Sequence, residues 1–329
     1  MSHSKRIAVL TSGGDAPGMN AAIRAVTLSA LSHQHQVFGF FSGYNGLINE
    51  HFTELNAASV TDIIHRGGTI LKSARCPQMH HTDGLLQAAN SLRKCHIDAL
   101  VVIGGDGSFK GAQALAEHWP GQIIGIPGTI DNDINGSDET IGFHTAIDTA
   151  LGCIDKIRDT AQAFERTFVV EVMGRDCGII AMEAGLASGA EQIICKELID
   201  DEPQFLQKLY EQVKANINND AGHSYVLVMA EHSLSISAEQ LAAQLTEHSG
   251  VESRSAILGY VQRGGAPVAG DRILATQLGC SAIEHLNAGA DGVMVGVVNN
   301  QLKTLAFEHT SDTQQRNRDF VARLKRFRR

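Results

Sequence analysis

The residues best suited to chemistry lie in a glycine-rich stretch, 104–108, and in a stretch that begins with glycine and carries carboxylates, 128–133. The first reads Gly-Gly-Asp-Gly-Ser and follows the apolar run 99–103. Glycines let backbone N–H groups approach a bound anion closely, and a helix that starts at such a loop directs its positive end toward that anion. Asp106, in the middle of this loop, would repel a phosphate unless a divalent cation lay between them. The stretch therefore predicts a site for a phosphate and a metal ion.

The second stretch adds carboxylates at the end of the next apolar run, 122–126. It contains Thr129, Asp131 and Asp133. Transfer of a phosphoryl group requires charge neutralisation, in-line placement and a base for the attacking hydroxyl. Asp131 fits the base and Asp133 a residue that orients it, although two carboxylates at this spacing are equally typical of a solvated turn or a simple cation site. We interpret the two loops together as a phosphoryl-transfer site.

Apolar runs and helical patterns alternate along the chain, which predicts an α/β protein with parallel sheets and right-handed crossovers. Strands are expected at 7–10, 37–41, 99–103, 122–126, 167–173, 191–195, 225–230 and 255–261. Helices are expected at 21–31, 109–116, 140–160, 178–187, 203–216, 238–248 and 271–288. Ligands of such sheets bind at the carboxyl ends of the strands. We expect the polar residues that follow the apolar runs to converge there: Gly14, Asp106, Asp131, Arg175, Glu231 and Arg263.

Further glycines and arginines can contribute to phosphate binding. Gly13 and Gly14 lie between a predicted strand and a predicted helix, which is typical of either a tight turn or a phosphate cradle. Arg75 is either an exposed loop charge or a ligand of a nucleotide phosphate. Four arginines could bind a phosphorylated substrate through their planar guanidinium groups: Arg166, Arg175, Arg254 and Arg263. An arginine at any one such position is more often part of a surface ion pair.

The composition excludes several classes of protein. The 329 residues suffice for two domains, and the formal net charge of −9 argues against nucleic-acid binding. No apolar run is long enough to span a membrane, and the N-terminus lacks a signal-peptide core. The six cysteines form no CxxC pair, so we expect neither structural zinc nor disulfides, but a reducing cytoplasm. The arginine-rich tail 314–329 is interpreted as a solvated face.

Two generic nucleotide-binding patterns fit poorly. The GxxxxGK[ST] sequence of P-loop kinases is absent. The run from Gly105 to Gly111 superficially resembles a dinucleotide loop, but Asp106 would oppose a metal-free pyrophosphate, and no acidic residue closes the next strand to hold a ribose.

Five segments, in this order, resemble the bacterial type of ATP-dependent 6-phosphofructokinase: 10–20, 104–108, 127–133, 170–175 and 262–265. The resemblance implies two interlocked Rossmann-like α/β domains with largely parallel sheets. It places an ATP- and Mg²⁺-binding domain at 1–139 plus about 262–311, and a sugar-phosphate-binding domain at about 140–261 plus 312–329. It implies phosphorylation of fructose 6-phosphate at the 1-hydroxyl in glycolysis, by a cytoplasmic homotetramer whose sugar-phosphate sites straddle a subunit interface.

The resemblance also assigns roles by position. Asp131 becomes the base for the sugar hydroxyl with Asp133 beside it, Thr129 and Arg175 become transition-state partners, and Asp106 becomes the Mg²⁺ ligand. The residues assigned to ATP are Gly14, Arg75, Cys76, Gly105, Asp106, Gly107 and Ser108. The residues assigned to fructose 6-phosphate are Thr129, Ile130, Asp131, Arg166, Met173, Gly174, Arg175, Glu231, Arg254, Tyr260 and Arg263. Among them, Arg166 and Arg254 are expected to reach in from a neighbouring subunit.

Two glycines bear on the phosphoryl donor. Pyrophosphate-dependent relatives usually carry aspartate at the position of Gly107 and lysine at that of Gly128, where bulk and charge obstruct the α-phosphate of ATP. ATP is therefore the expected donor. The alternatives are a pyrophosphate-dependent sugar kinase, an NAD or lipid kinase, a nicotinamide-binding dehydrogenase and a catalytically silent regulatory subunit.

The sequence departs from the family pattern near the substrates. Tyr260 stands where histidine is common; its hydroxyl can donate a hydrogen bond but not as a cation. Cys76 and Met79 replace aromatic residues that often flank adenine.

The allosteric nucleotide site of the family is also altered. Its residues Arg24, Arg158 and Glu191 remain, but Leu28 and Ala57 stand where arginines are usual, and the expected lysine-bearing segment reads differently at 218–223. Losing several charge-assisted contacts, each worth roughly 1.5–3 kcal/mol, removes most effector affinity. We predict weak or absent control by ADP and phosphoenolpyruvate.

Overall fold

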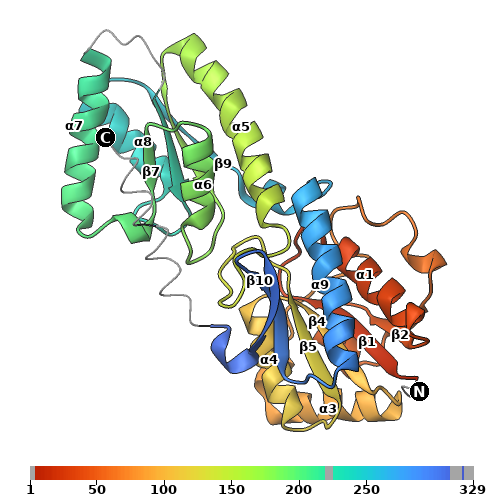
Figure 1. The fold of residues 1–329 in the computed structure, drawn as a ribbon. Coiled ribbons are helices and arrows are strands. Elements are labelled where there is room, and N and C mark those ends of the chain that lie inside the picture. The colour runs from red at the N-terminus through yellow and green to blue at the C-terminus, as the bar shows by residue number, and fades with distance from the viewer. Residues whose placement is uncertain (1–3, 219–224, 312–320, 322–329) are drawn as a thin grey trace. The chain divides into compact units, whose positions relative to one another are not determined.

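The computed structural model describes residues 4–218, 225–311 and 321 (Figure 1). Packing divides the chain into two units. The first comprises the residues up to Thr145 together with those from Arg263, and the second comprises Ala146–Gln262. The chain leaves the first unit near the start of helix α5 (Phe143–Phe164) and re-enters it at the end of the short helix η4 (Gly259–Arg263).

The first unit is built on a seven-stranded sheet in the order β11-β10-β5-β4-β1-β2-β3. Its strands are β1 (Arg6–Ser12), β2 (Gln36–Phe40), β3 (Phe52–Leu55), β4 (Ala99–Gly104), β5 (Gln122–Pro127), β10 (Val293–Val298) and β11 (Gln301–Ala306). The five inner strands are parallel, and β3 and β11 pair antiparallel at the edges. Every residue of β4 is buried, as expected for a parallel strand covered on both faces.

Helices cover both faces of this sheet. On one face, α1 (Met19–Ser32) packs against α9 (Ala269–Asn287), and a Cβ at Gly279 would lie 2.6 Å from the Cβ of Ala25. On the other, α2 (Tyr44–Ile48), α3 (Thr82–Lys94) and α4 (Asp106–Ala116) share one hydrophobic core with the sheet. Short 3-10 helices occur at Ala58–Val60, Pro77–His80 and Phe307–His309.

The second unit has a four-stranded parallel sheet in the order β7-β8-β6-β9. Its strands are β6 (Thr167–Val172), β7 (Gln192–Ile194), β8 (Tyr225–Ala230) and β9 (Ser253–Ile257). Leu227 and Met229 face α7 (Glu202–Asn218) and α8 (Ala238–Ser249) in one core. Val228 faces the opposite side, where α6 (Ile179–Ala187) packs with Gly185 against it. A 3-10 turn, η3, spans Lys196–Leu198.

The predicted α/β class with largely parallel sheets is confirmed, and the differences are local. The strand expected at 255–261 is wrong in its second half, because β9 ends at Ile257 and Gly259, with φ of 53°, leads into η4. The sequence reading missed α2, α3, β3, β10 and β11. The segment 219–223 and the tail from 314, apart from Val321, lie outside the described residues. None of the described helices combines the length and apolar character needed to cross a bilayer.

Candidate active site

Three loops of the first unit leave the same edge of the sheet, because β1, β4 and β5 are neighbouring parallel strands. They begin at Gly13, Gly105 and Gly128. The N–H of Gly128 donates to the carbonyl of Gly104 at 3.0 Å, which joins the last two loops at their base. The glycine stretches singled out in the sequence are therefore brought together.

Asp106 lies in the first turn of α4, directly after Gly105. Its carboxylate lies 2.6 Å from the Lys110 ammonium and accepts a hydrogen bond from the Ser311 hydroxyl. The side chain is 21% exposed, so it remains accessible. Within residues 4–218 and 225–311, no three histidine, cysteine or acidic side chains cluster to hold a metal ion. One accessible carboxylate beside the glycine loop predicted to bind phosphate would suit Mg²⁺, which is usually bound by one or two carboxylates plus substrate phosphates.

The loop that carries Asp131 is closed and internally braced. A parallel bridge pairs Gly128 with Ile141 at its base, and the Thr140 hydroxyl donates to the Thr129 carbonyl at 2.6 Å. The N–H of Asp131 donates to the Thr129 hydroxyl at 3.2 Å. Asp131 is only 9% exposed. The carboxylate predicted to be the base is thus held largely out of water.

The neighbours of Asp131 differ in exposure. Ile130 is 2% exposed, and Asp133 is half-buried. Asn132 has φ of 50°, and its amide donates to the Asp138 carbonyl at 3.3 Å. This left-handed residue turns the chain between the two carboxylates. The roles of Asp131 and Asp133 remain predictions.

A polar cavity of about 310 Å³ opens beside the first loop. It is lined by Gly13, Gly14, Asp15, Thr69, Lys72, Ser73 and Arg263. The guanidinium of Arg263 lies against Gly14, where an added Cβ would be 3.0 Å from Nη1. Arg263, predicted to bind the sugar phosphate, is therefore placed beside a residue predicted to bind ATP.

The residues predicted to face ATP differ in their surroundings. Arg75 is exposed, and its carbonyl accepts a hydrogen bond from Asn45 at 3.1 Å. Cys76 packs against the hydrophobic core, and burial raises the pKa of its thiol, opposed by backbone hydrogen bonds. Met79 is 6% exposed within that core, so it is not a surface residue available to flank a base. Ser108 is buried, and its carbonyl accepts the Tyr44 hydroxyl at 2.7 Å.

A second group of predicted residues gathers at the carboxyl ends of β6 and β8, in the second unit. The carboxylate of Glu231 accepts hydrogen bonds from the N–H groups of Gly174, at 3.1 Å, and Arg175, at 2.7 Å. The N–H of Met173 donates to Gln262 Oε1 at 2.8 Å. Arg175 has φ of 58° and a side chain 64% exposed, so its guanidinium points to solvent from a fixed backbone.

Arg166 and Arg254 lie at the opposite edge of this sheet, where β6 and β9 begin. Arg166 precedes β6 and lies 2.7 Å from the Glu252 carboxylate, with its guanidinium 4.7 Å from the ring of Phe164. Arg254, near the start of β9, pairs with the same carboxylate. The two arginines predicted to act together are thus adjacent, but they are remote along the strands from Met173 and Glu231.

Residues 6–286 match the sequence profile of the phosphofructokinase family. The chain belongs to that family. It is 49% identical over 305 residues to the ATP-dependent 6-phosphofructokinase of Staphylococcus epidermidis, covering 92% of each chain, and 46% identical over 317 residues to that of Staphylococcus aureus, covering 96% of each. The structure of phosphofructokinase from Saccharomyces cerevisiae superposes with a TM-score of 0.88 at 32% identity over 98% of this chain. The chain spans about half, 47%, of that yeast chain.

The remaining predicted residues of this phosphofructokinase-family chain concern regulation and the sugar. Arg158 pairs with Glu191 at 2.8 Å, and it also donates to the Gly189 carbonyl at 3.2 Å. The other carboxylate oxygen of Glu191 accepts the N–H of Val226 at 2.8 Å. Arg24 is half-buried in α1. Tyr260 is 79% exposed in η4.

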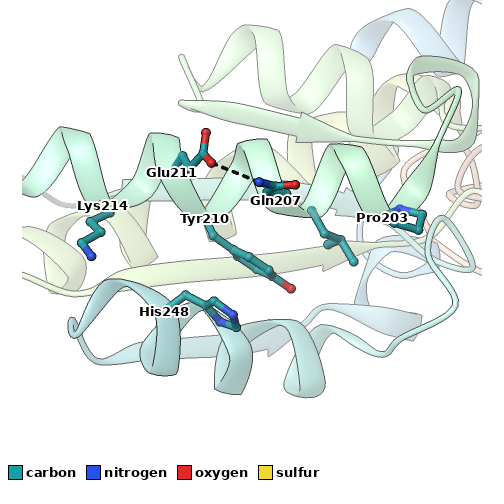
Figure 2. A pocket seen from close by; sticks show the side chains of 7 residues that line it. Pro203, Gln207, Tyr210, Glu211, Lys214 and His248 are labelled. Atoms are coloured by element: carbon teal, nitrogen blue, oxygen red, sulfur yellow. Dashed lines mark hydrogen bonds between the residues drawn. The ribbon is translucent and has the colours of Figure 1, made fainter.

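A second cavity, of about 440 Å³, lies between α7 and α8 (Figure 2). The Tyr210 ring stacks on His248 with centroids 4.3 Å apart, and its hydroxyl donates to Gln244 at 2.5 Å. The full lining is Pro203, Leu206, Gln207, Tyr210, Glu211, Lys214 and His248. None of the predicted site residues of the phosphofructokinase-family chain belongs to this lining.

Two positions with site contacts were missed by the sequence reading. Gln262 is fully buried and fixes the backbone of Met173, although only its membership of the Gln-Arg-Gly-Gly run was noted. Lys72 lines the polar cavity, but the sequence analysis does not single it out. The one signal in the sequence is a second cation three residues before Arg75, after Gly67 and Gly68.

Proposed function

We propose that this chain is an ATP-dependent 6-phosphofructokinase. It transfers the γ-phosphoryl group of ATP to the 1-hydroxyl of fructose 6-phosphate, giving ADP and fructose 1,6-bisphosphate in glycolysis. The observation that supports this best is the adjacency of the two loops carrying Asp106 and Asp131, in a chain nearly half identical to proteins of that activity. Among the alternatives raised by the sequence, none is favoured by a specific contact in the described residues.

The first unit is assigned to the phosphoryl donor. Backbone N–H groups of Gly14 and Gly105 cradle phosphates, with the α4 N-terminus adding its positive end. Asp106 would hold Mg²⁺, which supplies charge neutralisation on the transferred group. To hold the metal, Asp106 would have to give up its contacts with Lys110 and Ser311.

Asp131 is assigned as the general base. It accepts the proton of the sugar 1-hydroxyl as the oxygen attacks the γ-phosphorus and ADP leaves. Its burial and the bracing of its loop by Thr129 and Thr140 keep the carboxylate in one position. A positioned base contributes about 10²–10⁴-fold to the rate. Thr129 and Arg175 are assigned to stabilise the negative charge that develops on the transferred phosphoryl group in the transition state.

The second unit is assigned to fructose 6-phosphate. Met173, Gly174, Arg175 and Glu231 share the carboxyl end of its sheet. The Glu231 oxygen Oε1 already accepts two backbone N–H groups, so Oε2 is the oxygen assigned to the sugar hydroxyls.

We also propose that the chain self-associates, as its resemblance to the phosphofructokinase family implies, and the position of two arginines supports this. At about 3.3 Å per residue, the six residues of β6 separate Arg166 from Met173 by roughly 20 Å. One sugar phosphate cannot contact both ends of the strand. The resemblance assigns Arg166 and Arg254 to the sugar phosphate of a second copy in a homotetramer, and this separation is compatible with that assignment. Both guanidinium groups then bind the 6-phosphate, either after leaving the Glu252 carboxylate or while still paired with it.

Phosphorus NMR of the purified protein with fructose 6-phosphate, Mg²⁺ and either ATP or pyrophosphate tests this function. We expect the resonance of a sugar 1-phosphate to appear with ATP and not with pyrophosphate. Turnover with pyrophosphate alone would assign the chain to the pyrophosphate-dependent class. No turnover with either donor would favour the silent regulatory subunit.

A further inference from the structure

Lys72 adopts a backbone conformation that is costly for a lysine. Its φ is 58°, in the left-handed region that glycine occupies without penalty and that residues with a Cβ generally avoid. Other described residues, His96 among them, share this conformation, so it identifies no site on its own. What distinguishes Lys72 is that its long cationic side chain leaves this backbone beside the first glycine loop.

Hydrogen bonds fix the backbone at Lys72 to the end of β1. The N–H of Lys72 donates to the Thr69 carbonyl at 3.1 Å, and its carbonyl accepts the buried Thr11 hydroxyl at 2.7 Å. The next residue, Ser73, donates its hydroxyl to the carbonyl of Gly13 at 2.7 Å. The loop is thus tied to the first glycine loop, and the direction in which Lys72 leaves the backbone is set by these bonds.

The side chain of Lys72 lies at the polar cavity beside Gly14. The residue is exposed, and its ammonium makes no hydrogen bond or ion pair with any residue that the structure describes. Two cations, Lys72 and Arg263, line this cavity against one carboxylate, Asp15. A glycine backbone between two cations suits a dianionic phosphate group, which both can contact through charge-assisted bonds.

We propose that Lys72 is a further phosphate-binding residue of the donor site. Its ammonium binds a terminal phosphate of the polyphosphate donor in the cavity beside Gly14 and Arg263. The strained backbone is the cost of aiming this cation at the glycine loop. The identity of the donor as ATP rests on the proposed function; the phosphate chemistry rests on the cavity alone.

The test compares four variants by thermal unfolding and by calorimetric titration with Mg-ATP and with inorganic tripolyphosphate, without sugar. Lys72→Gly removes both strain and charge, Lys72→Met removes only the charge, and Lys72→Arg keeps the charge. His96→Gly is the matched control, because exposed His96 has φ of 54° and lies outside the assigned site.

We expect Lys72→Gly to unfold at a higher temperature than the wild type and to bind both ligands about 10-fold more weakly. Lys72→Met should lose the same affinity without the rise in unfolding temperature, and Lys72→Arg should bind within about threefold of the wild type. His96→Gly should raise the unfolding temperature and leave both dissociation constants unchanged. Equal losses of affinity in Lys72→Gly and Lys72→Met, which differ in backbone freedom but both lack the ammonium, would identify the charge as the cause.

Wild-type affinity for both ligands in Lys72→Gly and Lys72→Met would overturn the proposal, as would a wild-type protein that binds neither ligand. The proposed function fails separately. Tripolyphosphate binding that depends on Lys72, in a protein that does not phosphorylate fructose 6-phosphate, would keep this inference and reject the activity. Normal phosphorylation of fructose 6-phosphate, with unchanged binding of both ligands in the Lys72 variants, would keep the proposed activity and reject this inference.

Discussion

Asp271 and Thr145 are joined by two hydrogen bonds in the interior of the first unit. One carboxylate oxygen of Asp271 accepts the Thr145 N–H at 2.8 Å and the Thr145 hydroxyl at 2.5 Å, and the other accepts the Gly142 N–H at 2.9 Å. The Thr145 hydroxyl in turn accepts the N–H of Val268 at 3.1 Å. Asp271 thereby accepts one N–H group just before α5 and one in its first turn, next to Ile141, which closes the loop of the proposed base.

Removing this carboxylate should destabilise the protein. Asp271 is fully buried, so Asp271→Ala leaves three hydrogen-bond donors without their acceptor in the interior. We expect the free energy of unfolding to fall by about 3 kcal/mol or more. Asp83→Ala is the matched control, because Asp83 is an exposed acid in the first turn of α3, and it should cost no more than about 1 kcal/mol. Equal losses in urea titrations of the two variants would contradict the role given to Asp271.

The stability of the protein should also depend on the ionisation of Asp271. Burial raises the pKa of this carboxyl above its ordinary value of 3.8, partly offset by hydrogen bonds from Thr145 and Gly142. The folded state then holds the proton more tightly than the unfolded state, so this group stabilises most below pH 3.8. Its contribution is lost as pH rises from there through the raised pKa of the folded state.

The comparison with Asp271→Asn isolates this effect. The free energy of unfolding of the wild type minus that of the variant should fall as pH rises above 3.8, by at most about 1.4 kcal/mol per pH unit, and then level off. A difference that instead grows with pH would mean that hydrogen bonding outweighs burial at this site.

Gly107 should set the choice of phosphoryl donor without affecting folding. A Cβ at Gly107 would meet no atom of the described residues within 4 Å, whereas one at Gly128 would lie 3.0 Å from Ile103. Gly107→Asp should therefore unfold within about 1 kcal/mol of the wild type and lose ATP turnover at least about 100-fold, because the carboxylate repels the nucleotide phosphates. Gly107→Ala, which adds a methyl group but no charge, serves as control and should retain most activity. Unchanged kcat/KM for ATP in Gly107→Asp would remove donor selection from this position.

Control by effectors should be weak or absent. The Arg158 guanidinium is already bound to Glu191 and to the Gly189 carbonyl, so an anionic effector would have to displace these contacts. We expect fructose 6-phosphate saturation curves to change less than about twofold with added phosphoenolpyruvate or ADP, in the wild type and in Arg158→Ala alike. Normal activation or inhibition by either compound, abolished in Arg158→Ala, would show that the site is functional.

How much of the fold the sequence predicted depended on the kind of pattern. Continuous apolar runs such as 99–103 mark parallel strands buried on both faces, and these were found with little error. The edge strand β11 mixes polar and apolar residues without a regular pattern, and most of its side chains are exposed, so it contains no continuous apolar run that would indicate a strand. The helix α3 was missed although Leu85, Ala88 and Leu92 recur at helical spacing. Charged and amide residues interrupt them in the sequence, so the segment contains no continuous apolar run.

The candidate site was predictable where glycines and carboxylates follow strands, since strand order brings them to one edge. Contacts between side chains of segments far apart in the sequence were not predictable. The pairing of Arg166 and Arg254 on Glu252 depends on β6 lying beside β9, which no local pattern reveals. The left-handed backbone of Lys72 is likewise imposed by Thr11, 61 positions away in the chain.

The activity of Asp131→Asn tests the central claim most directly. Asparagine keeps the size and the hydrogen-bonding carbonyl of the side chain but cannot accept the proton of the sugar hydroxyl. We predict that kcat for phosphorylation of fructose 6-phosphate by ATP falls by about 10²–10⁴-fold, while the dissociation constants of both substrates stay within about threefold of the wild type. A kcat within about fivefold of the wild type would contradict the assignment of Asp131 as the base.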